Sequence, residues 1–261
     1  MRLFDERQLA RAPPFCRLDQ SQLRRVRDLA RLDTAAIGTV VFDEGQPALR
    51  FHLILSGHVR LVRLTAEGEQ IIVLHVPAGQ LFGLGTPLGR ATRQETAIAA
   101  DDCQMLSWPA ALWQVFSDDY ASFAAETMRA LGARAEEMSN RIVELSTKLV
   151  EQRIACALLR MIGQSGRKVA GGIEIGFPIS RQNIADMTGT TLHTVSRVLS
   201  AWEKRGLIHS TRCNIVVADP HGMVAISSGV GRADQPVTAA ASAARKAASS
   251  RPYSSQASIT V

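Results

Sequence analysis

Three side chains near position 195 have types and spacing that suit the reading of DNA bases. His193, Ser196 and Arg197 follow one another at i, i+3 and i+4 within the stretch TTLHTVSRV, so a helix would project them from one face. A guanidinium can donate two hydrogen bonds to O6 and N7 of guanine, and imidazole and hydroxyl groups also reach base edges. The pattern predicts a helix that enters the major groove of double-stranded DNA.

The residues before this helix have the order expected of a helix-turn-helix. Ser180 can cap a first helix over 181–187, because Ser is a favoured N-cap residue. Gly189 lies where a tight turn needs positive φ, and either Thr190 or Thr191 can cap the second helix. The sequence therefore predicts two short helices joined by a glycine turn.

The opposite face of the second helix is apolar. Val195, Leu199 and Trp202 recur at i, i+4 and i+7, so this stripe would pack on a core while the polar face reads DNA. Two apolar runs follow, at 207–210 and 215–217, and they suit a hairpin wing. We expect a winged helix-turn-helix.

Six further residues would lie where such a unit meets the DNA backbone. Basic and hydroxyl side chains bind phosphates without reading sequence. Each of them, taken alone, is equally well explained as a solvated surface group. The candidate phosphate contacts are Arg181, Thr190, Thr191, Lys204, Arg205 and Arg212.

Composition agrees with a two-domain DNA-binding protein. The chain has 261 residues, of which 46% are apolar and 21% charged, and its formal net charge of +6 suits a polyanion partner. No apolar run approaches the roughly 20 residues of a membrane span, so we expect no membrane partner. The start, MRLFDER, lacks the apolar core of a signal peptide, which predicts a cytoplasmic protein.

The four cysteines predict no metal site. Cys16, Cys103, Cys156 and Cys213 are far apart, with no CxxC pair and no His/Cys spacing typical of zinc. Isolated reduced thiols are the simplest interpretation.

Residues 40–108 read as short strands separated by glycine turns. Even spacing of this kind predicts an antiparallel jelly roll or barrel, which would enclose a pocket. The expected strands are 39–42, 51–55, 59–64, 71–76, 96–100 and 104–108.

A long helix follows, with apolar residues in a 4-3 rhythm. A seam repeating every 3.5 residues calls for a partner helix, and a parallel homodimer is the simplest arrangement. The alternative is that this face packs on the chain's own roll. We expect the helix to break near Ser146 or Thr147. The predicted seam consists of Met128, Leu131, Ala135, Met138, Ile142 and Leu145.

These elements predict an α+β fold in four units. The last unit is rich in Ala, Ser and Gly and has too little apolar surface to fold, so we expect it to be disordered. The units are a sensor roll with a helical lead-in (1–116), a dimerisation helix (117–146), a winged helix-turn-helix (147–226) and a tail (227–261).

This order of units resembles the CRP/FNR family of bacterial transcription regulators. The resemblance covers about residues 10–220 and rests on PAGQLFG at 77–83, on SerGly at 56–57, and on SRQNIADMTG at 180–189 leading into HTVSR. The reading helix is most similar to the branch that responds to nitric oxide or low oxygen and controls denitrification genes. A regulator, rather than an enzyme, is implied.

The resemblance also implies roles for the reading residues. Family members read DNA with a Glu, a Ser or Gly, and an Arg; Ser196 and Arg197 match, and they imply a TTG-type inverted repeat. His193 departs from the Glu, which leaves its base preference open. His193 as a phosphate or solvent contact is the alternative. RNA polymerase is an implied partner if the protein is an activator.

Two effectors of the family do not suit this sequence. Cyclic AMP binders need a Glu after PheGly and a Ser or Thr after an Arg, whereas Leu84 and the pair Arg93–Gln94 stand here. An iron–sulfur cluster needs about four thiolates, and only Cys16 and Cys103 lie in or before the roll.

Haem is the remaining effector that the sequence suggests. His52, His58 and His75 are candidate axial ligands in the roll, although most strand histidines are packed or surface residues. One alternative is a constitutively competent regulator with an empty roll. Another is a cupin-like metal enzyme, which would need clustered histidines with a Glu; His52 and His58 lie six residues apart without such a cluster.

Overall fold

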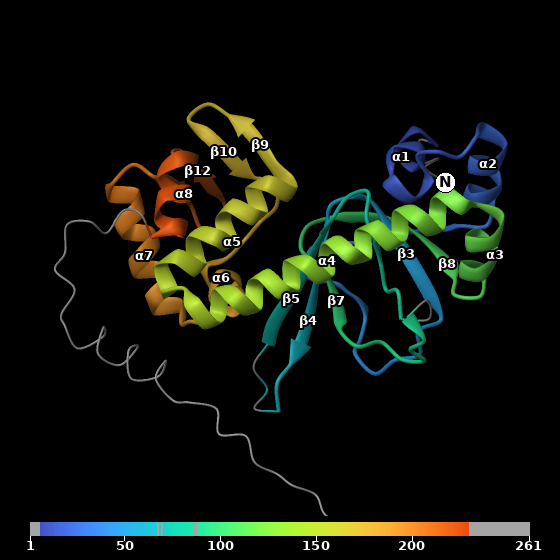
Figure 1. The fold of residues 1–261 in the computed structure, drawn as a ribbon, viewed down its shortest axis with the longest axis horizontal. Helices are drawn as coiled ribbons and strands as arrows, with labels where there is room; N and C mark the ends of the chain where they lie inside the picture. The colour runs from blue at the N-terminus through green and yellow to red at the C-terminus, as the bar shows by residue number, and fades with distance from the viewer. Residues whose placement is uncertain (1–5, 67, 69, 86–87, 230–261) are drawn as a thin grey trace, which may run out of the picture.

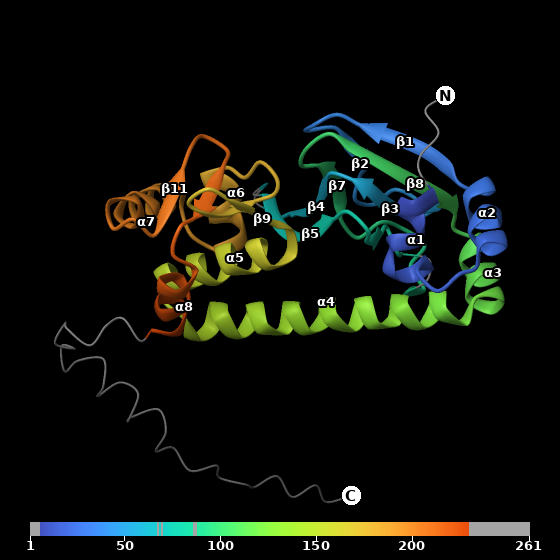
Figure 2. The same cartoon turned by 90° about the horizontal axis from the view of Figure 1, so that it is seen from above.

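The computed structural model describes residues 6–66, 68, 70–85 and 88–229. An N-terminal β-roll and a C-terminal winged helix-turn-helix unit, called the reading head below, lie beside one long helix. This helix, α4 (Ala121–Thr147), runs alongside both units (Figures 1 and 2). The expected α+β fold is confirmed.

The roll consists of two four-stranded antiparallel sheets, with strand orders β1-β8-β3-β6 and β2-β7-β4-β5. The six expected strands are present, because short apolar runs end at glycine turns as the sequence indicates. Strands β1 and β6 were not predicted. The strands are β1 (Arg31–Ala35), β2 (Val40–Phe42), β3 (Arg50–Ser56), β4 (His58–Leu64), β5 (Gln70–Pro77), β6 (Leu81–Phe82), β7 (Thr96–Ala99) and β8 (Cys103–Pro109).

An aromatic cluster closes the roll against the N-terminal helices and the start of α4. Phe15, Phe51 and Trp108 are almost fully buried and pack on one another, and the Trp108 indole donates a 2.8 Å hydrogen bond to the carbonyl of Val26. This cluster fixes where α4 leaves the roll. The helices around it are α1 (Glu6–Arg11), η1 (Pro13–Phe15), α2 (Gln20–Asp28) and α3 (Leu112–Asp119).

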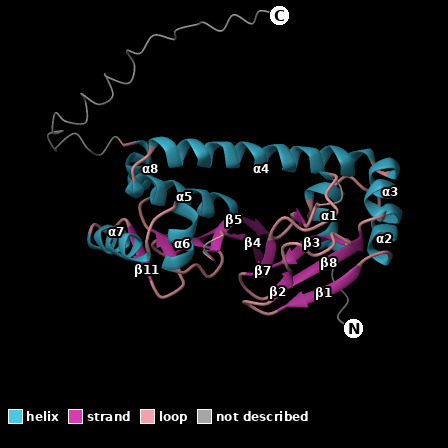
Figure 3. Cartoon of the chain, turned by 90° about the horizontal axis from the view of Figure 1, so that it is seen from below, coloured by secondary structure: helices cyan, strands magenta, loops and turns pink. Residues whose placement is uncertain are grey.

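Helix α4 ends at Thr147, as the sequence predicts. The hydroxyl groups of Ser146 and Thr147 bond the carbonyls one turn back, a pattern that weakens a helix. Helix α5 (Val150–Ser165) begins three residues later and turns back beside α4 (Figure 3). The start of α4 at Ala121 differs from the expected start at residue 117, because residues up to Asp119 form the separate helix α3.

The reading head has the expected helices and wing, plus elements that the sequence did not reveal. Strands β9 and β10 extend the wing to a four-stranded sheet of order β11-β12-β10-β9. Helix α8 continues to Ser228, past the boundary expected at 226; the tail from 230 lies outside the described residues. The elements are β9 (Gly166–Val169), β10 (Gly172–Ile175), α6 (Arg181–Thr188), α7 (Leu192–Lys204), β11 (Ile208–Ser210), β12 (Ile215–Val217) and α8 (Pro220–Ser228).

Candidate nucleic-acid interface and sensor

Helix α6 and the turn after it follow the predicted pattern. The Ser180 hydroxyl accepts from the backbone N–H of Asn183, while the Asn183 side chain accepts from the backbone N–H of Ser180. Gly189 adopts φ of 59°, which a residue with a Cβ rarely adopts. Thr191, rather than Thr190, caps α7 by accepting from the N–H of Thr194 at 3.3 Å.

Helix α7 separates a buried face from an exposed one. Val195, Leu199 and Trp202 have no exposed surface, whereas His193 and Arg197 are exposed. Ser196 is half-buried. The helix lies at the end of the molecule remote from the roll (Figures 1 and 2). His193 and Arg197 are therefore exposed on α7, although His193 also borders a groove that Gln70 and Ile71 of β5 line.

Two contacts that the sequence did not reveal fix the position of α7. The Trp202 indole donates to a carboxylate oxygen of Glu151 on α5 at 2.9 Å. The Glu203 carboxylate accepts from both the backbone N–H and the hydroxyl of Ser210 on the wing. Glu151 and Ser210 both lie outside α7, so no pattern within that helix indicates either contact.

The candidate phosphate contacts lie around the same surface. Thr191, Lys204, Arg205 and Arg212 are exposed, while Arg181 and Thr190 are half-buried. Sequence reasoning missed Leu192, which is 42% exposed beside His193. The sequence feature that could have identified Leu192 is an apolar residue directly after the helix cap.

The predicted dimer seam is largely an exposed apolar stripe on α4. Met128, Met138, Ile142 and Leu145 are 46–67% exposed, and Ala135 is exposed as well. Leu131 departs from the prediction, because it is half-buried and packs against the core of the roll. Sequence reasoning also missed the exposed Val143.

The roll and the reading head touch through an aromatic contact. Phe177, from the loop before α6, is stacked on His75 and packed on His58, with ring centroids 4.8 and 4.6 Å apart. Arg141 of α4 donates to the carbonyls of Val73 in the roll and Met187 in the head. Helix α4 thus contacts both the roll and the reading head through Arg141.

Arg93, the residue that the resemblance places at the phosphate of cyclic-nucleotide binders, is bonded by its own chain. Arg93 donates to the carbonyls of Gly83 and Arg50 at 2.7 and 2.5 Å, and its guanidinium lies 4.0 Å from the centroid of the Phe42 ring. A Cβ on Gly83 would be 2.5 Å from the Arg93 guanidinium. Leu84 is buried in the core.

The three candidate haem histidines do not converge on one site. His52 is stacked on Phe82, and burial, followed by repulsion from Arg93, lowers its pKa to about 3. His58 pairs with the Asp101 carboxylate at 2.9 Å. Of the three, only His75 lines the cavity described below.

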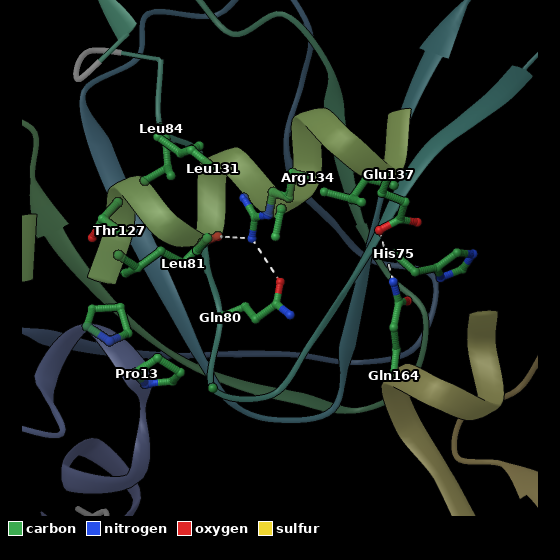
Figure 4. Close-up of a pocket in the computed structure, with 15 residues that line it drawn as sticks. Pro13, His75, Gln80, Leu81, Leu84, Thr127, Leu131, Arg134, Glu137 and Gln164 are labelled. Carbon is green, nitrogen blue, oxygen red and sulfur yellow. Dashed lines mark hydrogen bonds between the residues drawn. The ribbon is translucent and has the colours of Figure 1, made fainter. Parts of the chain in front are cut away.

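That cavity, of about 220 Å³, lies between α4, the roll and the N-terminal turn (Figure 4). Pockets for drug-sized ligands begin near roughly 300 Å³, and a porphyrin is larger than most such ligands. The residues around His75 therefore do not fit a haem in this arrangement.

The described residues offer neither a metal site nor a membrane span. No group of three His, Cys, Asp or Glu side chains in this part of the chain lies close enough to hold a metal ion. No helix in it is long and apolar enough to cross a membrane. A cupin-like enzyme would need the first of these features.

Comparison with known proteins identifies both units. Residues 34–120 match the cyclic nucleotide-binding domain family, and residues 152–226 match the Crp-like helix-turn-helix domain family.

Known relatives match this chain across both units. The chain is 26% identical over 216 residues to the nitrogen fixation regulation protein FixK of Bradyrhizobium diazoefficiens, covering 81% of this chain and 88% of that protein. It is 29% identical over 185 residues to the global nitrogen regulator of Synechococcus elongatus, covering 70% and 83%. The structure of FixK2 from Bradyrhizobium japonicum shares the fold, with a TM-score of 0.67 and 22% identity over 80% of this chain and 99% of that one. The chain belongs to the CRP/FNR family of DNA-binding transcription regulators.

Proposed function

We propose that this regulator acts as a homodimer that reads a TTG-type inverted repeat. The observation that carries the proposal is the open face of α7, where Arg197 and His193 are exposed while the opposite stripe is fully buried. Arg197 would donate to the guanine, and Ser196 would contact the thymine part of each half-site. The exposed stripe on α4 would pair two copies, so the spacing of half-sites would follow the two-fold axis.

The signal in this proposal is nitric oxide or low oxygen, and the targets are genes of nitrogen-oxide metabolism and denitrification. Its support is the similarity of the reading helix to that branch, together with relatives named for nitrogen regulation. Haem at His75 stays a prediction, and it would require the cavity to widen. An absorption spectrum of the reduced protein, with and without added haem and nitric oxide, tests it through the presence of a Soret band.

A second candidate within the same class is a regulator that is competent without a cyclic nucleotide. The closed arrangement of Arg93 favours it, because the guanidinium already bonds Gly83 and Arg50. Cyclic AMP would have to displace both contacts. This candidate predicts that DNA affinity is the same with and without cyclic AMP.

The test of the proposed operator is a binding titration on matched duplexes. The full-length protein should bind a TTG inverted repeat, and replacing both guanines should weaken binding at least about 30-fold, because each Arg–guanine pair accounts for about 1–3 kcal/mol. A shuffled duplex of equal length and composition is the control. Equal affinity for repeat and shuffled duplexes would refute sequence reading.

A further inference from the structure

The cavity between the roll and α4 has mainly apolar walls built from four parts of the fold. It is bounded by the N-terminal turn η1, by β5 and the segment after it, by α4 and by α5 (Figure 4). At about 220 Å³ it is larger than the roughly 150 Å³ cavity that holds benzene, so a ligand of about eight to ten non-hydrogen atoms would fit. The apolar lining residues are Pro13, Pro14, Leu74, Leu81, Leu84, Ala130, Leu131 and Ala133.

Buried polar groups in this apolar wall lack hydrogen-bond partners. Thr127 is 1% exposed and its hydroxyl has no partner, and His75 is 7% exposed with no partner for either ring nitrogen. Unpaired buried polar groups typically cost about 1–3 kcal/mol each. Thr127 therefore offers an incoming ligand a hydroxyl group that no protein atom in the described part of the chain bonds.

Arg134 adds a positive charge to the same wall. It donates to the side-chain oxygen of Gln80 at 3.0 Å and to the carbonyl of Leu81 at 2.6 Å, while its Nε has no partner (Figure 4). Both acceptors are neutral. No carboxylate within the described ranges comes within the 4.0 Å of an ion pair with Arg134.

The nearest acidic side chain is already engaged. Glu137 forms an ion pair with Arg160 at 3.4 Å and accepts from the amide of Gln164 at 3.0 Å. Burial lowers the pKa of Arg134, and the charge of Glu137 opposes this shift. A guanidinium removed from water without a paired anion is costly, so an incoming anion would be stabilised here.

We propose that this cavity binds a small monocarboxylate with an apolar tail, its carboxylate facing Arg134 and Thr127. Burial keeps the His75 ring neutral, because it lowers the pKa to about 3, so the ring adds no second positive charge to the wall. The tail would fill the space beside Leu131 and Leu84. Because the walls include α5 through Gln164, such a ligand would touch both the sensor and the reading head.

Calorimetric titration of the full-length protein with hexanoate, which has eight non-hydrogen atoms, tests this proposal. We expect one site per chain, with 1-hexanol and hexylammonium binding at least tenfold more weakly. Replacing Arg134 with Met or Thr127 with Val should lower the hexanoate affinity at least tenfold and at least threefold, respectively. Absence of hexanoate binding, or equal binding of 1-hexanol, would overturn the proposal.

A cavity-filling variant localises the site and guards against misfolding of the Arg134 variant. Ala130→Phe should abolish hexanoate binding, whereas Ala121→Phe, at the exposed start of α4, should leave it unchanged. Hexanoate binding that survives Ala130→Phe would place the ligand elsewhere and refute the proposal. The titration contains no DNA, so its outcome is separate from that of the operator test.

Discussion

The Phe177 ring is stacked on the His75 imidazole at an interplanar angle of 28°, and this contact joins the reading head to the roll. Phe177 is only 5% exposed, and its other neighbour in the roll is His58. Met187 of the head packs against a small apolar cluster of the same sheet. The two units therefore share a buried boundary rather than a flexible tether.

Replacing Phe177 with Ala should loosen this boundary. Loss of a buried Phe typically costs about 3–5 kcal/mol of unfolding free energy, and we expect the head and roll to unfold in separate steps. Denaturant unfolding monitored by tryptophan fluorescence and by circular dichroism measures both effects. Leu49→Ala, at a 70% exposed position, is the control and should change stability by less than about 0.5 kcal/mol. A single transition of unchanged midpoint in the Phe177 variant would contradict this prediction.

Acid should destabilise the fold through two buried histidines. Burial, followed by repulsion from Arg93 at His52 and from Arg60 at His75, lowers both pKa values from 6.5 to about 3. Below pH 6.5 each histidine binds a proton in the unfolded state but stays neutral in the folded state. The stability that the neutral histidines contribute is therefore full above pH 6.5 and declines as the pH falls toward 3. Each histidine should cost roughly 2 kcal/mol between pH 6.5 and 5.

The measurement is the unfolding free energy of matched variants at pH 7 and pH 5. His75→Phe should remove about half of the acid loss, because it removes one of the two groups. His221→Phe, at an exposed position on α8, is the control and should keep the full loss. An acid loss of equal size in wild type and the His75 variant would show that His75 does not contribute.

The local features of the reading head could be predicted from the sequence, because caps, turns and an amphipathic stripe depend on residues that are close together in the chain. Ser180, Gly189 and Thr191 act as those patterns indicate. Strand β1 escaped prediction because its residues RLDTA carry charges on an edge strand, and its pairing with β8 is distant in sequence.

The sensor could be predicted only in outline. The strand pattern gives the roll, but the cavity depends on how α4 packs over it, which brings Thr127 beside Leu81 and Pro13. Leu131 illustrates the limit. It obeys the 3.5-residue rhythm of the seam, yet it packs against the core of the roll.

The exposed stripe on α4 should mediate dimerisation. Ile142→Arg, at a 65% exposed position, would place a charge in the proposed seam, and we expect sedimentation to show a shift from dimer to monomer. Affinity for the inverted repeat should fall toward that for a single half-site. Gln114→Arg adds the same charge at an exposed position of α3, away from the seam, and serves as the control. A monomeric wild-type protein, or a dimer unaffected by Ile142→Arg, would contradict the seam.

Arg197 and Lys204 should affect DNA binding in different ways. Arg197→Ala removes two hydrogen bonds to guanine in each half-site, so affinity for the TTG repeat should fall at least about 30-fold while affinity for the guanine-replaced repeat stays nearly constant. Lys204→Ala removes a phosphate contact from each protomer, so both duplexes should weaken equally and the salt slope should drop by about two. Fluorescence anisotropy at several salt concentrations measures both quantities. Arg129→Ala, on α4 and exposed, is the matched loss of charge away from α7. Equal weakening of both duplexes by Arg197→Ala would reduce Arg197 to a backbone contact and leave the guanine to another residue.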